Sequence, residues 1–310
     1  MTVEKRKGIS SLLTVNGVTR STTEWAKITG VDVNTISRRI REGWPEDKIF
    51  DSMAKTSRYS FNEHYFDVID NEHKAYWIGF IWCDGYLAIR NRNDRNSTSY
   101  EFKLSLQKSD DTHLKKLNED LNSNYKINYY TCNGFRGEGM LTEARLLITN
   151  QYFGKILAHN YGLIPNRSDC SKLLSNIPSD LMKHFIRGVI DADGSFSHYI
   201  VEESSEYGTY IIHKCAVDIG GQPELLKQIE QYLIKNNVVN NFNRKIYKRH
   251  QEDERDGVYR SLKFCGRNQA TALLHYIYDN ATVYLDRKYE KFLNIINELE
   301  GNNELQTILK

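Results

Sequence analysis

The chain has 310 residues, enough for one large domain or two of medium size. Hydrophobic residues make up 40% and charged residues 26%, which is ordinary for a soluble globular protein, and no apolar run reaches the roughly 18 residues that a membrane span requires. The net charge of +2 does not by itself indicate a nucleic-acid-binding protein, so the positions of the basic residues matter more than their number.

The N-terminal sequence and the cysteines both favour a protein that is not exported. MTVEKRKGIS is charged and no apolar segment follows it, so we predict no secretory signal and expect a cytoplasmic protein without a membrane partner. The 5 cysteines are odd in number and form no CxxC pair, which predicts neither a zinc site nor a disulfide framework. We interpret them as small buried or incidental residues.

Residues 1–55 predict a small helical domain. The stretch from Ser21 to Glu24 has the pattern of a capping box that opens a helix over 24–29, and Gly30 is expected to end that helix. A second helix is predicted over 34–42. Two short helices joined by a tight turn are typical of a helix-turn-helix, and a plain two-helix cap is the alternative.

Basic residues of the second helix are the DNA-binding candidates of this module. Arg38 and Arg39 are predicted to lie on the open side of the helix, where they would contact DNA. The segment WAKITGVDVNTISRRIREGWP resembles the helix-turn-helix modules attached to phage and intron-encoded endonucleases. A polar linker is predicted over 56–70.

An internal repeat occupies the rest of the chain. Segments 75–86 and 184–195 line up residue by residue, about 110 residues apart, and similar patterns follow each copy. Each copy predicts the order helix, two strands, helix, two strands, helix, from alternation in the strands and helical spacing of apolar residues. We therefore expect an α+β fold with two pseudo-symmetric αββαββα half-domains, at 71–175 and 176–310, and saddle-like antiparallel sheets.

The predicted elements after each repeated segment follow the same sequence in the two halves. In the first half, strands are predicted at 86–92, 100–107, 125–132 and 143–149, and helices at 111–122 and 151–161. In the second half, strands are predicted at 195–201, 209–219, 242–250 and 258–265, a helix at 223–236, and a long helical tail from Asn268.

Small residues recur four positions apart in each repeated segment. They are Gly79 and Cys83 in the first copy and Gly188 and Ala192 in the second. Positions four apart lie on one face of a helix, and small residues there let two backbones approach more closely than the usual 8–10 Å. We expect Gly79 and Gly188 to lie at the interface of two helices that pair around a pseudo-two-fold axis.

Each repeated segment ends in Asp-Gly. The glycines, Gly85 and Gly194, suit the left-handed conformation that terminates a helix. The aspartates, Asp84 and Asp193, would face the negative end of the helix dipole at a cost of roughly 0.3–1 kcal/mol, and pairing of the helices would bring the two carboxylates together. A cation between them would relieve both costs. Magnesium takes one or two carboxylates and completes its shell with water and phosphate oxygens, an arrangement suited to phosphodiester hydrolysis.

The repeat also separates the two acids of the second copy. Asp193 has a counterpart in Asp84, whereas Asp191 is replaced in the first copy by Trp82. A two-fold metal site would use the shared position. We therefore predict that Asp84 and Asp193 are catalytic ligands of Mg²⁺ (or Mn²⁺), and that Asp191 is a capping or hydrogen-bonding residue.

The segments IRGVIDADG and WIGFIWCDG resemble the LAGLIDADG motif of homing endonucleases, the second segment of the pair carrying tryptophan in place of the first acid. The resemblance covers about 240 residues, because the elements after each motif also fit the family. It implies that the motif helices pack together, that the last acid of each binds an essential divalent metal, and that the protein is a site-specific endonuclease for double-stranded DNA.

The resemblance implies further catalytic residues. A polar residue helps to order active-site water in the family, and Gln107 matches it at the end of a predicted strand. Family members also have a basic residue after the final helix of each half. Lys288 matches it in the second half, whereas Arg167 departs from the usual lysine in the first half. A solvated surface residue is the alternative for all three.

Alternation within the strands predicts one apolar and one polar face for each sheet. A face of Lys, Arg, Asn, Gln and Tyr side chains can enter a major groove and read base edges, and an ordinary solvated face is the alternative. Loop arginines would hold phosphates. The predicted DNA-binding residues are Arg90, Arg92, Lys103, Ser105, Lys126, Asn128, Asn243, Lys245, Tyr247, Arg249 and Lys263.

These patterns together favour a monomeric, Mg-dependent DNA endonuclease with a long and asymmetric target, because Trp82, Gln107 and Arg167 have no matching partners. A non-cleaving protein of the same fold, either an RNA maturase or a transcription regulator, is the main alternative. A metal hydrolase for small molecules would need more ligands than the scattered histidines supply. The chain ends lack splicing residues, so a self-splicing intein is not expected, and intron-encoded and free-standing genes both remain open.

Overall fold

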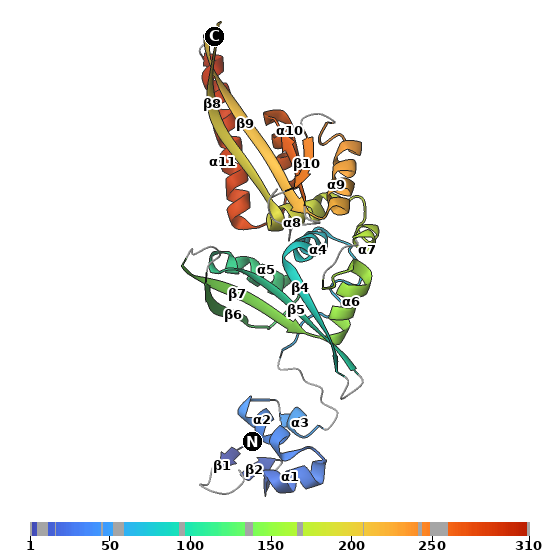
Figure 1. Ribbon diagram of the computed structural model, residues 1–310. Coiled ribbons are helices and arrows are strands. Elements are labelled where there is room, and N and C mark those ends of the chain that lie inside the picture. The colour runs from blue at the N-terminus through green and yellow to red at the C-terminus, as the bar shows by residue number, and fades with distance from the viewer. Residues whose placement is uncertain are drawn as a thin grey trace. The chain divides into compact units, whose positions relative to one another are not determined.

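The protein divides into two compact units, Met1–Tyr59 and Ser60–Lys310 (Figure 1). None of the described helices is long and apolar enough to cross a membrane. The structure, a computed structural model, describes residues 2–4, 12–15, 17–44, 46–51, 59–92, 97–133, 139–165, 170–206, 208–240, 244–248 and 260–308.

The N-terminal unit contains a small sheet that the sequence did not predict. Its elements are β1 (Thr2–Glu4), β2 (Leu12–Val15), β3 (Val18–Ser21), α1 (Thr22–Thr29), α2 (Val33–Arg41) and α3 (Glu46–Ile49), and the three strands form an antiparallel sheet in the order β1-β2-β3. The predicted capping box is confirmed, since Ser21 and Glu24 each accept a hydrogen bond from the other's backbone N–H. Gly30 ends α1 with φ 72°, as predicted. The unit is therefore an α/β module rather than a purely helical one.

Arg39 does not lie on the open side of α2. Its side chain is 5% exposed, and its guanidinium donates hydrogen bonds of 3.0, 2.9 and 2.9 Å to the carbonyls of Lys48, Ile49 and Asp51. The guanidinium also stacks over the Trp44 ring at 4.5 Å. The prediction that Arg39 is available to DNA is therefore wrong, because the residue holds α3 against α2. Arg38 is exposed.

The second unit consists of two halves with one topology, and the predicted αββαββα order is confirmed. The first half contains α4 (Glu72–Asp84), β4 (Gly85–Arg92), β5 (Ser97–Gln107), the short 3-10 helix η1 (Lys108–Asp110), α5 (Asp111–Asp120), β6 (Ile127–Asn133), β7 (Met140–Thr149) and α6 (Gln151–Tyr161). The second contains α8 (Met182–Asp193), β8 (Gly194–Ser205), β9 (Gly208–Gly221), α9 (Pro223–Lys235), β10 (Arg244–Lys248), β11 (Arg260–Cys265) and α10 (Arg267–Tyr278). Both sheets are antiparallel, in the equivalent orders β4-β5-β7-β6 and β8-β9-β11-β10.

Among the described residues of the second unit, two α-helices lie outside the repeat. The short helix α7 (Ser171–Ser175) connects the halves, and α11 (Asp286–Ile308) runs alongside the long β8–β9 hairpin (Figure 1). The predicted single helical tail from Asn268 is wrong, since residues 279–285 separate α10 from α11. The backbone of this break contacts both motif helices, since the Thr282 N–H donates to Glu72 of α4 and the Leu285 N–H donates to Asp191 of α8.

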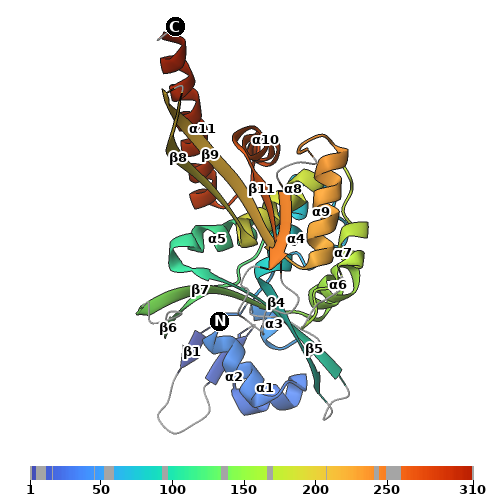
Figure 2. The same ribbon diagram turned by 45° about the horizontal axis from the view of Figure 1, so that its top comes forward.

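One face of each sheet is covered by helices. α5 and α6 pack on β5, and α9 and α10 pack on β9, which buries the apolar side chains of those strands. The helices α4 and α8 lie side by side between the two sheets (Figure 2). Their side chains belong to a single hydrophobic core that extends through both halves, so the second unit folds around one continuous apolar interior.

A polar contact joins the two halves at the start of α4. The Nδ1 atom of His73 lies 2.8 Å from the Asp120 carboxylate of α5, and its Nε2 atom lies 3.1 Å from the Thr282 hydroxyl in the segment between α10 and α11. Trp77 donates a further hydrogen bond to Asp120. The hydrogen bond to Asp120 raises the pKa of His73, in opposition to the effect of burial.

Replacing His73 by glutamine is expected to remove a pH-dependent part of the stability. A raised pKa means that the protonated imidazole stabilises the fold fully below its ordinary pKa of about 6.5, and that this contribution is lost as pH rises through the folded value. The midpoints of urea unfolding for the two proteins should therefore differ most below about pH 6.5 and converge as pH rises through the folded pKa of His73. As a control, Asn176→Ala, an exposed residue of the second half that contacts neither His73 nor Asp120, should change the midpoint by the same amount at every pH. A gap for His73→Gln that does not change with pH would contradict the assignment.

Candidate functional site

The two motif helices touch backbone to backbone. A Cβ atom built on Gly79 would lie 2.3 Å from the carbonyl oxygen of Phe185, and one built on Gly188 would lie 2.1 Å from the carbonyl oxygen of Tyr76. Real Cβ atoms do not approach so closely, so only glycine permits this separation of the helices. The sequence predicts this pairing, and the structure has both glycines at the contact between α4 and α8.

The glycines that follow the motif aspartates are extended, not left-handed. Gly85 has φ −75° and ψ 147°, and Gly194 has φ −90° and ψ 168°. The prediction of a left-handed helix end is therefore wrong at both positions. Each helix passes directly into a strand, and a Cβ atom would lie 2.4 Å from the Ile81 carbonyl oxygen or 2.7 Å from that of Ile190. Glycine is required there by lack of space.

Asp84 and Asp193 are the last residues of α4 and α8. Both carboxylates act electrostatically on the ammonium of Lys288, which is 6% exposed and donates hydrogen bonds of 2.5 and 2.6 Å to the carbonyls of Ile190 and Gly194. Burial lowers the pKa of Lys288 to about 8, and the neighbouring carboxylates act in the opposite direction. The structure thus gathers the two shared aspartates and Lys288 at one end of the helix pair.

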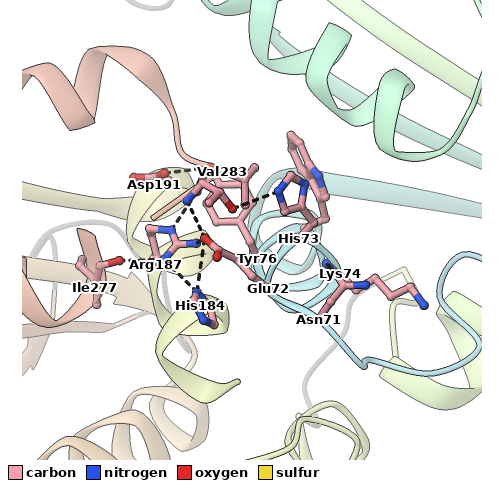
Figure 3. Close-up of polar contacts among 12 residues, drawn as sticks. Asn71, Glu72, His73, Lys74, Tyr76, His184, Arg187, Asp191, Ile277 and Val283 are labelled. Atoms are coloured by element: carbon pink, nitrogen blue, oxygen red, sulfur yellow. Dashed lines mark hydrogen bonds and ion pairs between the residues drawn. The ribbon is translucent and has the colours of Figure 1, made fainter. Parts of the chain in front are cut away.

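Asp191 has a different environment from Asp193. It is fully buried on α8, near Tyr76 of α4 (Figure 3). It accepts hydrogen bonds from the Tyr76 hydroxyl at 2.8 Å, the Tyr278 hydroxyl at 2.5 Å and the Leu285 N–H at 2.8 Å. Burial raises the pKa of Asp191, and these hydrogen bonds oppose the rise. The interpretation of Asp191 as a hydrogen-bonding residue is confirmed.

The donors at this end of the helix pair suit a hard divalent cation. Within the part of the chain that the structure describes, no three or more His, Cys, Asp or Glu side chains are grouped as metal ligands. Two carboxylates are nevertheless compatible with magnesium, which usually keeps several waters and substrate oxygens in its shell. Asp84 is exposed and Asp193 is half-buried, so water and a phosphate have access to this point.

The helix-free face of the first sheet carries polar and aromatic side chains. Ser105, Arg145 and Asn128 lie opposite one another on β5, β7 and β6. Arg145 donates hydrogen bonds to the Ser105 hydroxyl at 3.3 Å and the Glu143 carboxylate at 3.0 Å, and its guanidinium lies over the Tyr130 ring at 4.4 Å. Arg145 was not predicted as a site residue, although its alternation with buried Ala144 and Leu146 could have identified it.

The other predicted residues of the first half lie around this face. The ammonium of Lys103 lies 5.2 Å from the centroid of the Tyr86 ring, on the strand pair β4–β5. Arg90 is exposed and lies 3.4 Å from Glu101. Lys126, Asn128 and Gln107 are exposed, with Gln107 as the last residue of β5.

The second sheet has a basic hollow on its corresponding face. Lys263 lies opposite Asp218 and Lys245 in the strand register. A cavity of about 620 Å³ is lined by several residues of β8, β9 and β11, among them Tyr199, Lys214 and Lys263, and by Arg267 at the start of α10. Lys214 forms a 2.8 Å ion pair with Glu203. Sequence reasoning missed Lys214 and Arg267, because the first looked like one of many surface lysines and the second lies beyond a strand end.

The side chains of several predicted residues are not described by the structure. Asn243, Arg249 and Arg167 lie outside the described residues. For Arg92, Lys245 and Tyr247 the structure describes the backbone within β4 and β10.

The chain was also compared with known proteins. No family model matches it, and no curated protein matches its sequence. Solved structures to which it is similar include LAGLIDADG endonucleases. One is the meganuclease I-AabMI bound to uncleaved DNA, with 14% identity, a TM-score of 0.47, and coverage of 75% of this chain and 92% of that one. The meganuclease I-CpaMI, also bound to uncleaved DNA, has 14% identity, a TM-score of 0.47, and coverage of 77% and 95%. The homing endonuclease I-LtrWI, bound to target DNA, has 13% identity, a TM-score of 0.46, and coverage of 76% and 93%.

Proposed function

We propose that the protein is a site-specific endonuclease of the LAGLIDADG type that hydrolyses phosphodiester bonds of double-stranded DNA with a divalent metal. The observation that carries the proposal is the helix pair: two helices in backbone contact, each ending in an aspartate, with both carboxylates acting on one buried ammonium. A pair of carboxylates at helix C-termini is unfavourable unless a cation offsets it. Its presence in both copies of the repeat supports a shared chemical role.

Asp84 and Asp193 would hold the metal, which is magnesium or manganese. The metal, when bound, activates a water molecule and stabilises the leaving oxygen of a phosphodiester. Lys288 offsets the negative charge of the carboxylates and presents a positive charge to the phosphate. Its two carbonyl acceptors, Ile190 and Gly194, hold the ammonium in place. Gln107 would help to order water.

Double-stranded DNA would lie along the helix-free faces of the two sheets. Lys103, Ser105 and Arg145 offer charge and hydrogen bonds on the first sheet, and Lys263 with the basic hollow offers them on the second. Such side chains can read base edges in a major groove and contact phosphates. Because the two faces differ in composition, the preferred target would be long and asymmetric, and one chain would suffice to bind it.

The N-terminal unit would add affinity or specificity for the same DNA. Arg38 remains exposed on α2, whereas Arg39 is used within the unit. The helix-turn-helix assignment rests on α1 and α2 and on the tight turn at Gly30 between them.

Cleavage of a randomised duplex library tests the proposal. The purified protein should cut a small subset of sequences in the presence of Mg²⁺ and none with EDTA, with both strands broken. Selection of bound duplexes without any cleavage in Mg²⁺ or Mn²⁺ would instead support a non-cleaving regulator of the same fold. Splicing of a cognate intron by the purified protein would support a maturase.

A further inference from the structure

The interface between α4 and α8 contains an ion pair between a buried arginine and a partly exposed glutamate. Arg187 of α8 is fully buried, and its guanidinium donates a 2.6 Å hydrogen bond to the Glu72 carboxylate of α4 (Figure 3). The same guanidinium donates to the carbonyls of Val283 at 2.9 Å and Ile277 at 2.8 Å. Glu72 accepts a further hydrogen bond of 2.8 Å from the N–H of Thr282. Each charge is thus offset by partners in a specific arrangement.

A second polar contact crosses the same interface. The Tyr76 hydroxyl of α4 donates to the buried carboxylate of Asp191 on α8, and it also lies 2.9 Å from Nε2 of His113. Both Tyr76 and Asp191 are fully buried. Both contacts therefore join α4 to α8, as does His184 of α8, whose Nδ1 atom lies 3.6 Å from the Glu72 carboxylate.

Neither contact obeys the internal two-fold symmetry. The repeat aligns Glu72 with Leu181 and Arg187 with Ile78, so the position related to the ion pair is apolar on both sides. In the same way, the repeat aligns Tyr76 with Phe185 and Asp191 with Trp82. Each polar contact occurs once, and both residues at the symmetry-related position are apolar. We name the ion pair and the Tyr76–Asp191 contact the asymmetric lock.

We propose that the asymmetric lock makes α4 pair only with α8. It disfavours the pairing of two first halves, or of two second halves, from different molecules of the protein. In an α8–α8 pair, Arg187 would meet Leu181 and Asp191 would meet Phe185, each of them twice. In an α4–α4 pair, Glu72 would meet Ile78 twice. A buried charge without its partner is strongly destabilising, whereas the close glycine contact alone would permit all three pairings. This property of assembly holds whether or not the protein cuts DNA.

Reassembly of a nicked full chain tests the proposal. A protease site inserted after Pro165, beyond α6, would allow the folded protein to be cut between its halves. After unfolding in urea and refolding, native mass spectrometry counts the pairs. We expect only first-half with second-half pairs from the natural sequence. In Glu72→Leu/Arg187→Ile, which gives each position its repeat counterpart, the discrimination should fall at least about tenfold and like-half pairs should be detected. Lys74→Ile, on α4 but paired with Asp70 at the surface, should retain full discrimination.

A measurement on the intact chain guards against halves that fail to refold. Glu72→Leu should lower the urea midpoint more than the double variant does, because it leaves the fully buried guanidinium of Arg187 without its carboxylate. Like-half pairs from the natural sequence in statistical proportion would overturn the proposal. Additive midpoint shifts in the single and double variants would also overturn it, since they would mean that the two residues do not act as a pair.

Discussion

Asparagine in place of Asp193 is expected to lower the rate of DNA cleavage by about 1000-fold, which corresponds to about 4 kcal/mol of transition-state stabilisation. The amide keeps the shape of the side chain and removes the charge that would bind the metal. DNA affinity should change only a few-fold, because the sheet faces supply most of the contacts. Single-turnover cleavage and equilibrium binding, measured on the same preparation, separate the two effects.

Two further variants make this experiment specific. Asp84→Asn should give a loss of similar size, since the repeat assigns both aspartates the same role. Asp279→Asn, an exposed aspartate that follows α10, should leave cleavage unchanged. Robust cutting by Asp193→Asn would remove the proposed role of the pair, and a parallel loss of DNA binding and of folded structure would assign Asp193 a structural role instead.

Alanine in place of Gly188 is expected to lower the free energy of unfolding by several kcal/mol. The new Cβ atom would lie 2.1 Å from the Tyr76 carbonyl oxygen and 2.8 Å from the Phe80 nitrogen, both of them backbone atoms that cannot move alone. Such overpacking costs about 1–3 kcal/mol or more. In an open helix the same substitution would stabilise by roughly 1 kcal/mol, so the sign of the effect identifies the contact. Urea unfolding at fixed pH measures it.

Two other substitutions serve as references for the loss of stability in Gly188→Ala. Gly79→Ala should be nearly as harmful, because its Cβ atom would lie 2.3 Å from the Phe185 carbonyl oxygen. Ala272→Gly, at an exposed position of α10, should cost only about 1 kcal/mol through helix propensity. If Gly188→Ala unfolds at the same urea concentration as the natural protein, the two helices are not in backbone contact.

The topology of the second unit could be predicted because the sequence contains the same order of elements in two copies. Two copies of one element order reinforce each other, and local periodicity was enough for the helices and strands of both halves. The failures occur where a distant segment decides the local structure. Arg39 looks exposed from helical spacing, and only the backbone around Ile49, folded back by α3, buries it. The sequence pattern predicts a helix across residues 279–285. Their backbone is not helical, because it makes hydrogen bonds with Glu72, Asp191 and Arg187 of the motif helices.

The candidate site was predictable in part for a related reason. Comparison of the two repeats separates Asp193 from Asp191 without any structure, since only one of the two acids recurs. The conformation of Gly85 and Gly194 was not predictable, because a helix end followed by a loop and one followed at once by a strand both favour glycine. Arg145 lies on the strand predicted at 143–149, for which the sequence analysis assigns no outward-facing residues.

The position of the asymmetric lock has a consequence for how such a protein changes over time. The lock and the glycine contact lie on α4 and α8, whereas the polar faces of the sheets are built from other residues. Substitutions on one sheet therefore need no matching change in the other half. The proposed DNA-binding residues of each sheet can therefore change independently while the two halves remain paired. A first half from a relative should pair with this second half if it carries Glu72 and Tyr76, and a second half should pair with this first half if it carries Arg187 and Asp191.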